Sequence, residues 1–386
     1  MMARIGLERD DVEAAEKALD EALAKDFEVR KNPYYFFIQS FVLESKDRVE
    51  DAKDALKKAL QVPRFESVRN AKKKKKKKKK SGKISKVVDG ANLMVKIYER
   101  LAKLHHTLKQ IGDAESTIRE ALEIFEGTAQ ETELRIVESR QAMERGDAHK
   151  ALKLLALLIQ SSDVSEETWI QATQVKADIY LKHRKHKKGF IKCYQRISQR
   201  LRNKRGYVLL GDAYMRIHDP TKAIESYERA LREQPGDVAL TVLIGNTMMT
   251  THNYQAAVEY FESALDSHGQ DKTALRLALA ELLTRLKRWS EAQAILSDAI
   301  RDKKRRNNNN TEETTASWIE DVHILRILTN VYFGNGDDTQ ALETIQKANS
   351  IQDKILSRLG QNSNAAIAQK KIAAEIRCVI GTYICL

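Results

Sequence analysis

The side chains that could do chemistry are spread thinly, and none stands in a spacing typical of a reactive site. His183 and His186 are three residues apart, but lysines surround them and no acidic residue lies nearby, so a metal site is not expected. His105 and His106 are adjacent and would face different directions on a helix. The histidines therefore predict no metal centre.

Other reactive residue types give the same result. The Gly82-Lys83 pair has no earlier glycine at P-loop spacing and no serine or threonine directly after the lysine. Cys193, Cys378 and Cys385 are widely spaced and odd in number, which is typical of reduced side chains. The G-x-S-x-G, H-E-x-x-H and C-x-x-C motifs are absent. We therefore predict no catalytic residue, metal or cofactor, and a protein that is not an enzyme.

Much of the positive charge lies in one segment. The formal net charge is +13, and residues 72–80 are nine consecutive lysines, without which +4 remains. Adjacent like charges repel and cannot form an apolar helix face, so this run predicts a solvated loop. A basic tether or a nuclear-import signal is the alternative. The asparagine run at 307–310 is low-complexity sequence of the same kind and favours the loop.

A second basic segment is more structured. Residues 182–205 hold eleven lysines and arginines and no acidic residue, whereas residues 206–270 hold nine acids and four bases. Helical spacing of Phe190, Tyr194 and Ile197 predicts a helix that buries one side and exposes its bases. This face is either merely solvated or docks an acidic protein, a tubulin tail, a membrane phosphate or RNA. The candidate partner-binding residues are Arg184, Lys185, Lys187, Lys188, Arg196 and Arg200.

The elements that would position these residues are helices. Only 4 prolines and 16 glycines interrupt 386 residues, and apolar residues recur at helical spacing almost throughout. The longest strongly apolar stretch, residues 154–159, is too short to span a bilayer, and the N-terminus has no apolar signal region. We predict an all-α protein with no transmembrane segment, soluble and intracellular.

An internal repeat of 34 residues defines the expected fold. Gly211, Tyr214 and Ala223 reappear one period later as Gly245, Met248 and Ala257. Small residues let helices approach closely and aromatic rings fill the gaps between them, which is typical of tetratricopeptide repeats. The sequence predicts a superhelical solenoid of antiparallel helix pairs. The expected packing residues are Gly211, Tyr214, Ala223, Tyr227, Ala230, Gly245, Ala257, Phe261, Ala264, Ala280, Ala292 and Ala299.

The spacing of small residues also predicts the domain organisation. The expected small position early in each second helix is Ala15, Ala52, Thr117, Ala151, Gly189, Ala223, Ala257, Ala292 and Ala341. Two intervals are too long and contain low-complexity sequence. We therefore predict repeats in 1–61 (the first incomplete), 93–302 and 319–386 (one repeat plus a truncated terminal helix), separated by inserted loops at 62–92 and 303–318. Turns within pairs are expected at Gly112, at Gly146, at 218–220 and at 335–338.

Several stretches resemble one family in surface residues as well as in repeat positions. They include RIGLERDDVEAAEKALDEAL at 4–23, YLKHRK at 180–185 and LLGDAYMRIHDPTKAIESYERAL at 209–231. The chain resembles the tetratricopeptide repeat protein 21 family in one unbroken order, except across 62–92 and 303–318. That family forms the large, all-repeat subunit of intraflagellar transport complex A. Its members are much longer, so we expect this chain to be an internal or truncated piece.

The resemblance implies a non-catalytic scaffold that binds other complex A subunits, in the cytoplasm, the cilium or flagellum and its basal body. It would support retrograde transport and cilium assembly. The alternative is a basic solenoid that binds nucleic acid or anionic surfaces, and nucleic acid is the less favoured partner. A co-chaperone that grips peptide carboxylates is disfavoured, because Val208, Leu209, Val242 and Leu243 occupy the expected inner positions.

Overall fold

The described part of the chain is helical, with no strand. A computed structural model describes residues 12–65, 84–161, 164–267, 272–307, 314–359 and 364–384. The lysine run at 72–80 lies outside these residues. The chain divides into two compact units, Met1–Cys193 and Tyr194–Leu386, which are described in turn. Among the described residues, none of the helices is long and apolar enough to cross a membrane.

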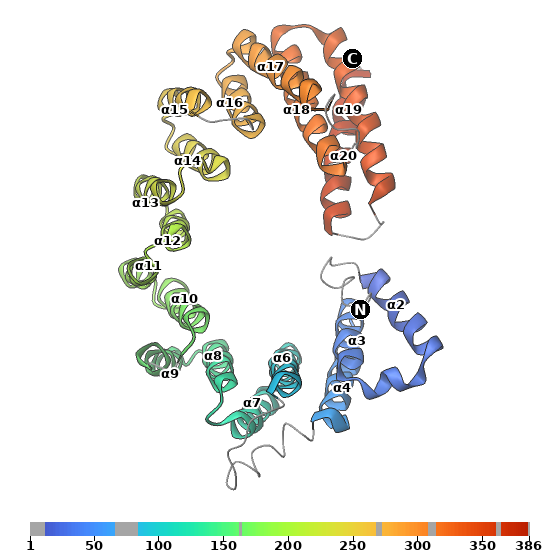
Figure 1. Ribbon diagram of the computed structural model, residues 1–386, viewed down its shortest axis with the longest axis vertical. Coiled ribbons are helices and arrows are strands. Elements are labelled where there is room, and N and C mark those ends of the chain that lie inside the picture. Colours follow the sequence, from blue (N-terminus) through green and yellow to red (C-terminus); the bar gives the residue numbers. More distant parts are fainter. Residues whose placement is uncertain are drawn as a thin grey trace. The chain divides into compact units, whose positions relative to one another are not determined.

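The first unit consists of helix pairs that follow one another along the chain (Figure 1). The pairs are α3 with α4, α6 with α7, and α8 with α9, and the first helices α6, α8 and α10 contact one another in sequence. The elements are α2 (Val12–Lys25), η1 (Phe27–Lys31), α3 (Pro33–Ser45), α4 (Val49–Gln61), η2 (Pro63–Phe65), α6 (Ile84–Thr107), α7 (Ile111–Phe125), α8 (Ala129–Glu144), α9 (Ala148–Gln160) and α10 (Glu166–Lys182).

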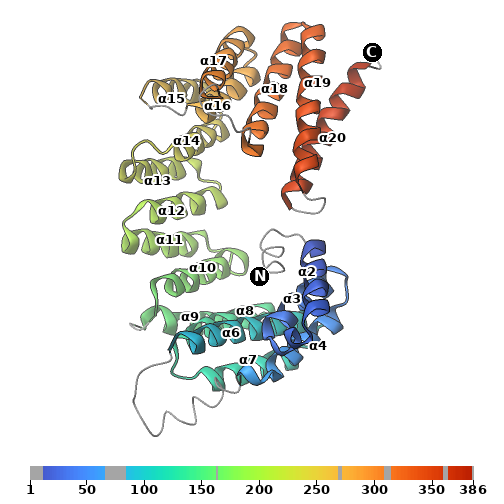
Figure 2. The same ribbon diagram turned by 45° about the vertical axis from the view of Figure 1, so that its right-hand side comes forward.

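The second unit repeats this arrangement (Figure 2). Helix α11 (Lys187–Leu201) crosses the division between the units. Pairing joins α12 with α13, α14 with α15, α16 with α17, and α18 with α19, and α20 packs on α19. These elements are α12 (Lys204–Arg216), α13 (Pro220–Glu233), α14 (Val238–Thr250), α15 (Tyr254–Ser267), α16 (Thr273–Arg285), α17 (Trp289–Asn307), α18 (Thr315–Asn335), α19 (Asp338–Arg358) and α20 (Asn364–Ile384). Both units show the tetratricopeptide-type architecture of helix pairs.

The turns within pairs share a left-handed residue between the two helices. The N–H of Asp219 donates to the carbonyl oxygen of Tyr214 (3.0 Å), and His218 between the helices has a left-handed φ of 62°. This is the Schellman arrangement that satisfies the last carbonyl groups of a helix. Left-handed residues occupy the same place in the other turns: Asp47, Lys109, Gly146 and Lys185 in the first unit, His252, Lys287 and Gly336 in the second.

We expect Gly336→Ala to lower the free energy of unfolding by about 1 kcal/mol, because φ is 86° there and an L-residue is strained in that region. No atom lies within 4 Å of the added Cβ, so the loss comes from the backbone alone. Gly112→Ala is the control, since Gly112 lies inside α7 with equally open surroundings. It should raise stability by roughly 0.5–1 kcal/mol. Urea unfolding of both variants measures the difference, and equal shifts would contradict the turn assignment.

Close contacts between glycines and aromatic rings hold the pairs together in the second unit. A Cβ added to Gly211 would lie 2.3 Å from Cε1 of Tyr227, and one added to Gly245 would lie 2.2 Å from Cζ of Phe261. The Tyr227 hydroxyl donates to Oδ1 of Asp212 (2.7 Å). Burial, together with the hydrogen bond to Asp212 and its negative charge, raises the Tyr227 pKa. The ring can therefore fill the gap over Gly211 while its hydroxyl stays satisfied.

The other predicted packing residues lie in the same interior. Tyr214 is 8% exposed and accepts a hydrogen bond from Nε2 of Gln195 (3.2 Å). One cluster gathers Ala257, Phe261, Ala264, Ala280 and Ala292 from α15, α16 and α17. The remaining alanines, Ala223, Ala230 and Ala299, have no exposed surface. A third pair of the glycine–aromatic kind, Gly334 with Trp289, was not predicted from the sequence.

The helices extend into both segments predicted to be inserted loops. Helix α6 begins at Ile84, inside the predicted 62–92 loop, and η2 covers Pro63–Phe65. Ala91, at the end of the predicted loop, and Leu93 and Met94, directly after it, are buried. Helix α17 continues to Asn307 and α18 begins at Thr315, so the predicted 303–318 loop is also too long.

Lys303 explains why α17 extends. Its Nζ lies 2.7 Å from Oδ1 of Asp321 and 3.7 Å from Oε2 of Glu320, and it donates to the carbonyl oxygen of Ser317. The residue is only 6% exposed, so a lysine that looked like part of a polar loop is a paired, buried charge on the helix.

Three details of the predicted register are also wrong. Gly112 lies in the first turn of α7, and the left-handed turn residue is Lys109. Counted from that turn, the small residue of α7 is Ala114, three residues before Thr117. At the α10–α11 turn, the N–H of His186 reaches back to the carbonyl oxygen of Tyr180 (2.8 Å), one residue further than in the other turns. The equivalent of Ala223 is then Phe190, not Gly189.

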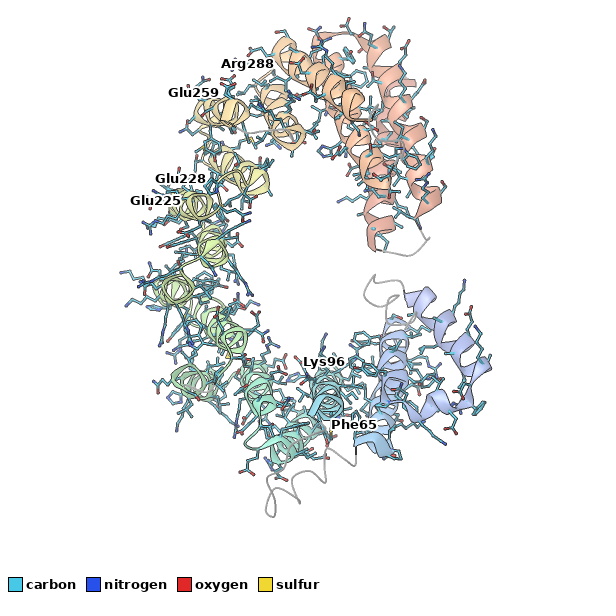
Figure 3. The ribbon with its side chains drawn as sticks, viewed as in Figure 1. Phe65, Lys96, Glu225, Glu228, Glu259 and Arg288 are labelled. Atoms are coloured by element: carbon cyan, nitrogen blue, oxygen red, sulfur yellow. The ribbon has the colours of Figure 1, made fainter. Side chains whose placement is uncertain are left out.

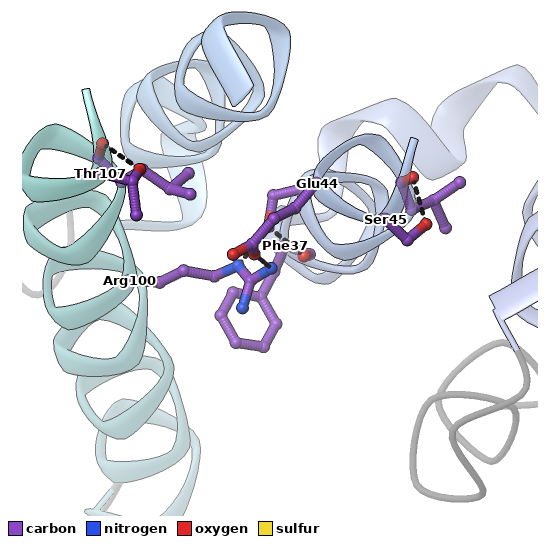
Figure 4. Close-up of polar contacts among 8 residues, drawn as sticks. Phe37, Glu44, Ser45, Arg100 and Thr107 are labelled. Carbon is purple, nitrogen blue, oxygen red and sulfur yellow. Dashed lines mark hydrogen bonds and ion pairs between the residues drawn. The ribbon is translucent and has the colours of Figure 1, made fainter. Parts of the chain in front are cut away.

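An arginine joins the helices on either side of residues 66–83 in the first unit. Arg100 on α6 pairs with Glu44 on α3, and its Nε donates to Oγ of Ser40 (3.0 Å), as Figure 4 shows for Arg100 and Glu44. Its guanidinium carbon also lies 3.2 Å from the ring centre of Phe41. Burial lowers the Arg100 pKa, and the charge of Glu44 partly offsets that effect. This cluster fastens α3 to α6.

Candidate functional site

The first four of the predicted partner-binding bases belong to the first unit. Arg184 and Lys185 lie between α10 and α11, Lys187 and Lys188 lie in the first turn of α11, and all four are exposed. The turn is fixed by the N–H of Gly189, which donates to Nδ1 of His186 (3.0 Å). Lys187 has an interaction partner within the chain.

The other two bases belong to the second unit. Arg196 and Arg200 are exposed on α11, while Tyr194 and Ile197 on its other side are buried. Arg196 and Arg200 each interact with another group of this chain. The structure thus places all six bases on the surface and divides them between the units.

A hollow of about 400 Å³ lies between α7, α8 and the start of α9 in the first unit. Arg135 lines it from α8, where Nη1 lies 3.0 Å from Oε2 of Glu138 and Nη2 lies 3.3 Å from Oε1 of Glu131, both on the same helix. Burial disfavours the charge of Arg135, but these two carboxylates outweigh it and raise the pKa. Arg145 pairs with Glu115 across the same hollow. The Arg145–Glu115 pair links the end of α8 to α7, whereas the pairs of Arg135 stay within α8.

A second hollow, of about 450 Å³, lies within the second unit among α11, α12 and α13. Arg202, Lys222 and Arg229 line it together with one carboxylate, that of Glu225. This groove was not predicted from the sequence, because Arg202 and Arg229 are 27 positions apart and neither lies at a repeat position. The turn between the two helices would predict that Arg202 is exposed, but not that it lines the same groove as Arg229.

The surface of the second helices carries charges of both signs. Figure 3 labels Glu225 and Glu228 on α13, Glu259 on α15, and Arg288 just before α17. Over the described ranges, no three histidine, cysteine or acidic side chains are grouped to hold a metal ion. The chemistry that this arrangement offers is therefore charge pairing and packing at exposed helix faces.

Two family models match the chain over separate ranges. The tetratricopeptide repeat protein 21 ARM repeat matches residues 27–197, and the fourth ARM domain of tetratricopeptide repeat protein 21 matches residues 240–385. A general tetratricopeptide repeat model matches residues 205–237 between them.

Relatives match over almost the whole length of this chain. Tetratricopeptide repeat protein 21B is 31% identical in Homo sapiens and 32% in Mus musculus, each over 99% of this chain. Tetratricopeptide repeat protein 21A of Mus musculus is 28% identical over the same share. The chain spans about 28% of the length of both 21B relatives and 27% of the 21A relative. Because two models specific to one family and these relatives agree along the chain, the protein belongs to the tetratricopeptide repeat protein 21 family.

Proposed function

We propose that this chain is a scaffold segment of intraflagellar transport complex A. It binds other subunits of that complex through exposed helix faces, supports retrograde transport and cilium assembly, and works in the cytoplasm, the cilium and the basal body. It performs no catalysis. The observation that carries the proposal is the match to the tetratricopeptide repeat protein 21 family along nearly the entire chain.

The architecture supports a binding role. Within each unit, the described helix pairs pack on their neighbours along the chain, which leaves a series of helix faces available to partners. The described surface offers charges and half-buried apolar residues, such as Val208 and Val242, but no metal-ligand cluster. Packed protein interfaces use this mixture of apolar contacts and a polar rim.

We expect the double variant Lys185→Glu, Lys188→Glu to slow capture of an acidic complex A subunit without unfolding the chain. Both lysines are exposed, and complementary charge at a rim speeds association more than it strengthens it. Each charge is worth about 0–1 kcal/mol, so capture should weaken and not vanish. Pull-down from purified complex A subunits, with association followed in real time, measures the effect.

The matched control is Lys57→Glu, Lys58→Glu on α4, which makes the same charge change at exposed positions of the same unit. If both variants slow capture equally, only net charge matters and the basic turn is not a docking site. If neither affects subunit capture but salt-sensitive binding of an oligonucleotide is lost from the first variant, the nucleic-acid alternative holds for these residues.

A further inference from the structure

The groove among α11, α12 and α13 has features of a binding site. Its floor is closed by Leu210 (7% exposed), Tyr214 (8%) and Ser198 (5%). Tyr214 is held in place by the hydrogen bond from Gln195. The groove therefore has buried side chains at its floor and charged side chains on its walls.

The walls carry more positive than negative charge. The charge of Lys222 is partly compensated, since its Nζ lies 2.8 Å from Oδ2 of Asp219. Arg202 donates from Nε to the carbonyl oxygen of Gln199 (3.2 Å), a neutral acceptor that leaves its charge uncompensated. Arg229 forms no ion pair with any residue that the structure describes. Two arginine charges thus face a groove in which Glu225 is the sole acidic lining residue.

The backbone explains how Arg202 comes to stand there. Its φ is 46°, in the left-handed region, and the next residue, Asn203, caps α12 by accepting a hydrogen bond from the N–H of Gly206 (3.0 Å). This sharp turn directs the chain from α11 into α12. Arg229 lies one helical turn after Glu225 on α13, so both project from the same helix face.

We propose that this groove binds an acidic peptide segment of a partner protein, whose carboxylates pair with Arg202 and Arg229. Guanidinium groups match carboxylates in geometry, and two that form no ion pair with the described residues and come from different elements can hold successive acidic side chains. The inference rests on the proposed scaffold role and adds the chemistry of one partner segment.

The charges around the groove favour a peptide over a nucleic acid. Glu225 lies among the bases, and α13, which forms one wall, belongs to residues 206–270, which hold nine acids against four bases. A continuous polyanion would have to pass these acids, whereas a short peptide can place its separate carboxylates beside the arginines. The excess of positive charge in the groove is local, so a short acidic segment fits it better than a long polyanion.

The test is fluorescence anisotropy of a labelled oligoglutamate peptide with the purified full chain. Residues 72–80 are replaced by glutamine in every sample, because nine lysines would bind any polyanion and hide the groove. The variant is Arg202→Gln, Arg229→Gln. The control is Arg232→Gln, Arg285→Gln, which removes two exposed arginines of the same unit that do not line the groove.

We expect the groove variant to raise the Kd about five- to twentyfold and the control to change it less than about twofold. Equal changes in both variants would overturn the proposal, as would stronger binding of a labelled oligonucleotide that depends on the same two arginines. Circular dichroism of each variant checks that the helices are retained.

A parallel pull-down of complex A subunits by the parent chain separates this inference from the scaffold role. If the parent chain captures complex A subunits but the groove variant binds the peptide as the parent does, only the peptide-binding proposal is overturned. Failure of the parent to capture any subunit counts against the scaffold role, whatever the peptide assay shows.

Discussion

Gly245→Ala is expected to lower the free energy of unfolding by about 1–3 kcal/mol, although alanine normally favours a helix over glycine. The added Cβ would lie 2.2 Å from Cζ of Phe261, a ring with no exposed surface, so the α14–α15 contact must open. The loss should extend to the neighbouring pairs, because each pair is stabilised by its interfaces. Urea unfolding and amide hydrogen exchange across 238–286 measure both effects.

Two further variants make the result specific. In the background of Phe261→Leu, which removes the far end of the ring, Gly245→Ala should cost much less, with a coupling energy of roughly 0.5–3 kcal/mol. Gly112→Ala should stabilise, since its surroundings are open. If Gly245→Ala is as stable as Gly112→Ala, the proposed close approach of α14 and α15 does not exist.

Arg100→Met should destabilise the first unit by about 2–3 kcal/mol. This is less than the loss on breaking a fully buried ion pair, because the Glu44 side chain is 29% exposed. Methionine keeps the apolar stem but leaves the carboxylate without its partner and removes the hydrogen bond to Ser40. The contact between α3 and α6 should loosen. Thermal unfolding and hydrogen exchange in α3 are the measurements.

The control is Arg301→Met, which breaks the exposed pair with Asp298 and should cost no more than about 0.5–1 kcal/mol. The double variant Arg100→Met, Glu44→Met should recover part of the loss, because no unpaired charge then remains. If Arg100→Met unfolds at the same temperature as the Arg301→Met control, the Arg100–Glu44 pair does not stabilise the contact between α3 and α6.

The repeat itself was predictable from the sequence because it depends on residue size. Gly211 facing Tyr227 and Gly245 facing Phe261 recur at one period, and the helix pairs follow from that pattern. The confirmed prediction is the all-α solenoid of helix pairs. The turns at Gly146, at 218–220 and at 335–338 were also predicted, and each contains a left-handed residue. The turns at His252 and Lys287 were not predicted, since these residues take up the left-handed conformation without glycine.

Register errors arose where the turn residue gives no sequence signal or the turn is one residue longer than the others. Because Lys109 gives no turn signal, the sequence predicts the turn at Gly112 and the small position at Thr117, whereas the structure has them at Lys109 and Ala114. The ends of the inserted loops were wrong for a related reason, since Lys303 in a polar run is held by acids on the next helix.

The candidate sites depend on tertiary contacts that a one-dimensional pattern does not contain. The basic segment at 182–205 was visible in the sequence, and its predicted bases are exposed. By contrast, Arg100 reaches a carboxylate 56 positions earlier, and the groove combines Arg202 with Arg229. Such pairs become apparent only when the packing of the helices is known.

The central claim is that this chain is a protein-binding scaffold of complex A, and quantitative affinity purification from ciliated cells tests it most directly. The tagged chain, with residues 72–80 replaced by glutamine, is recovered with and without nuclease and washed at low and high salt. We predict that complex A subunits co-purify and remain bound after both treatments, as expected of a packed interface. Recovery of nucleic acid and its binding proteins alone, lost on nuclease or high salt, would contradict the claim.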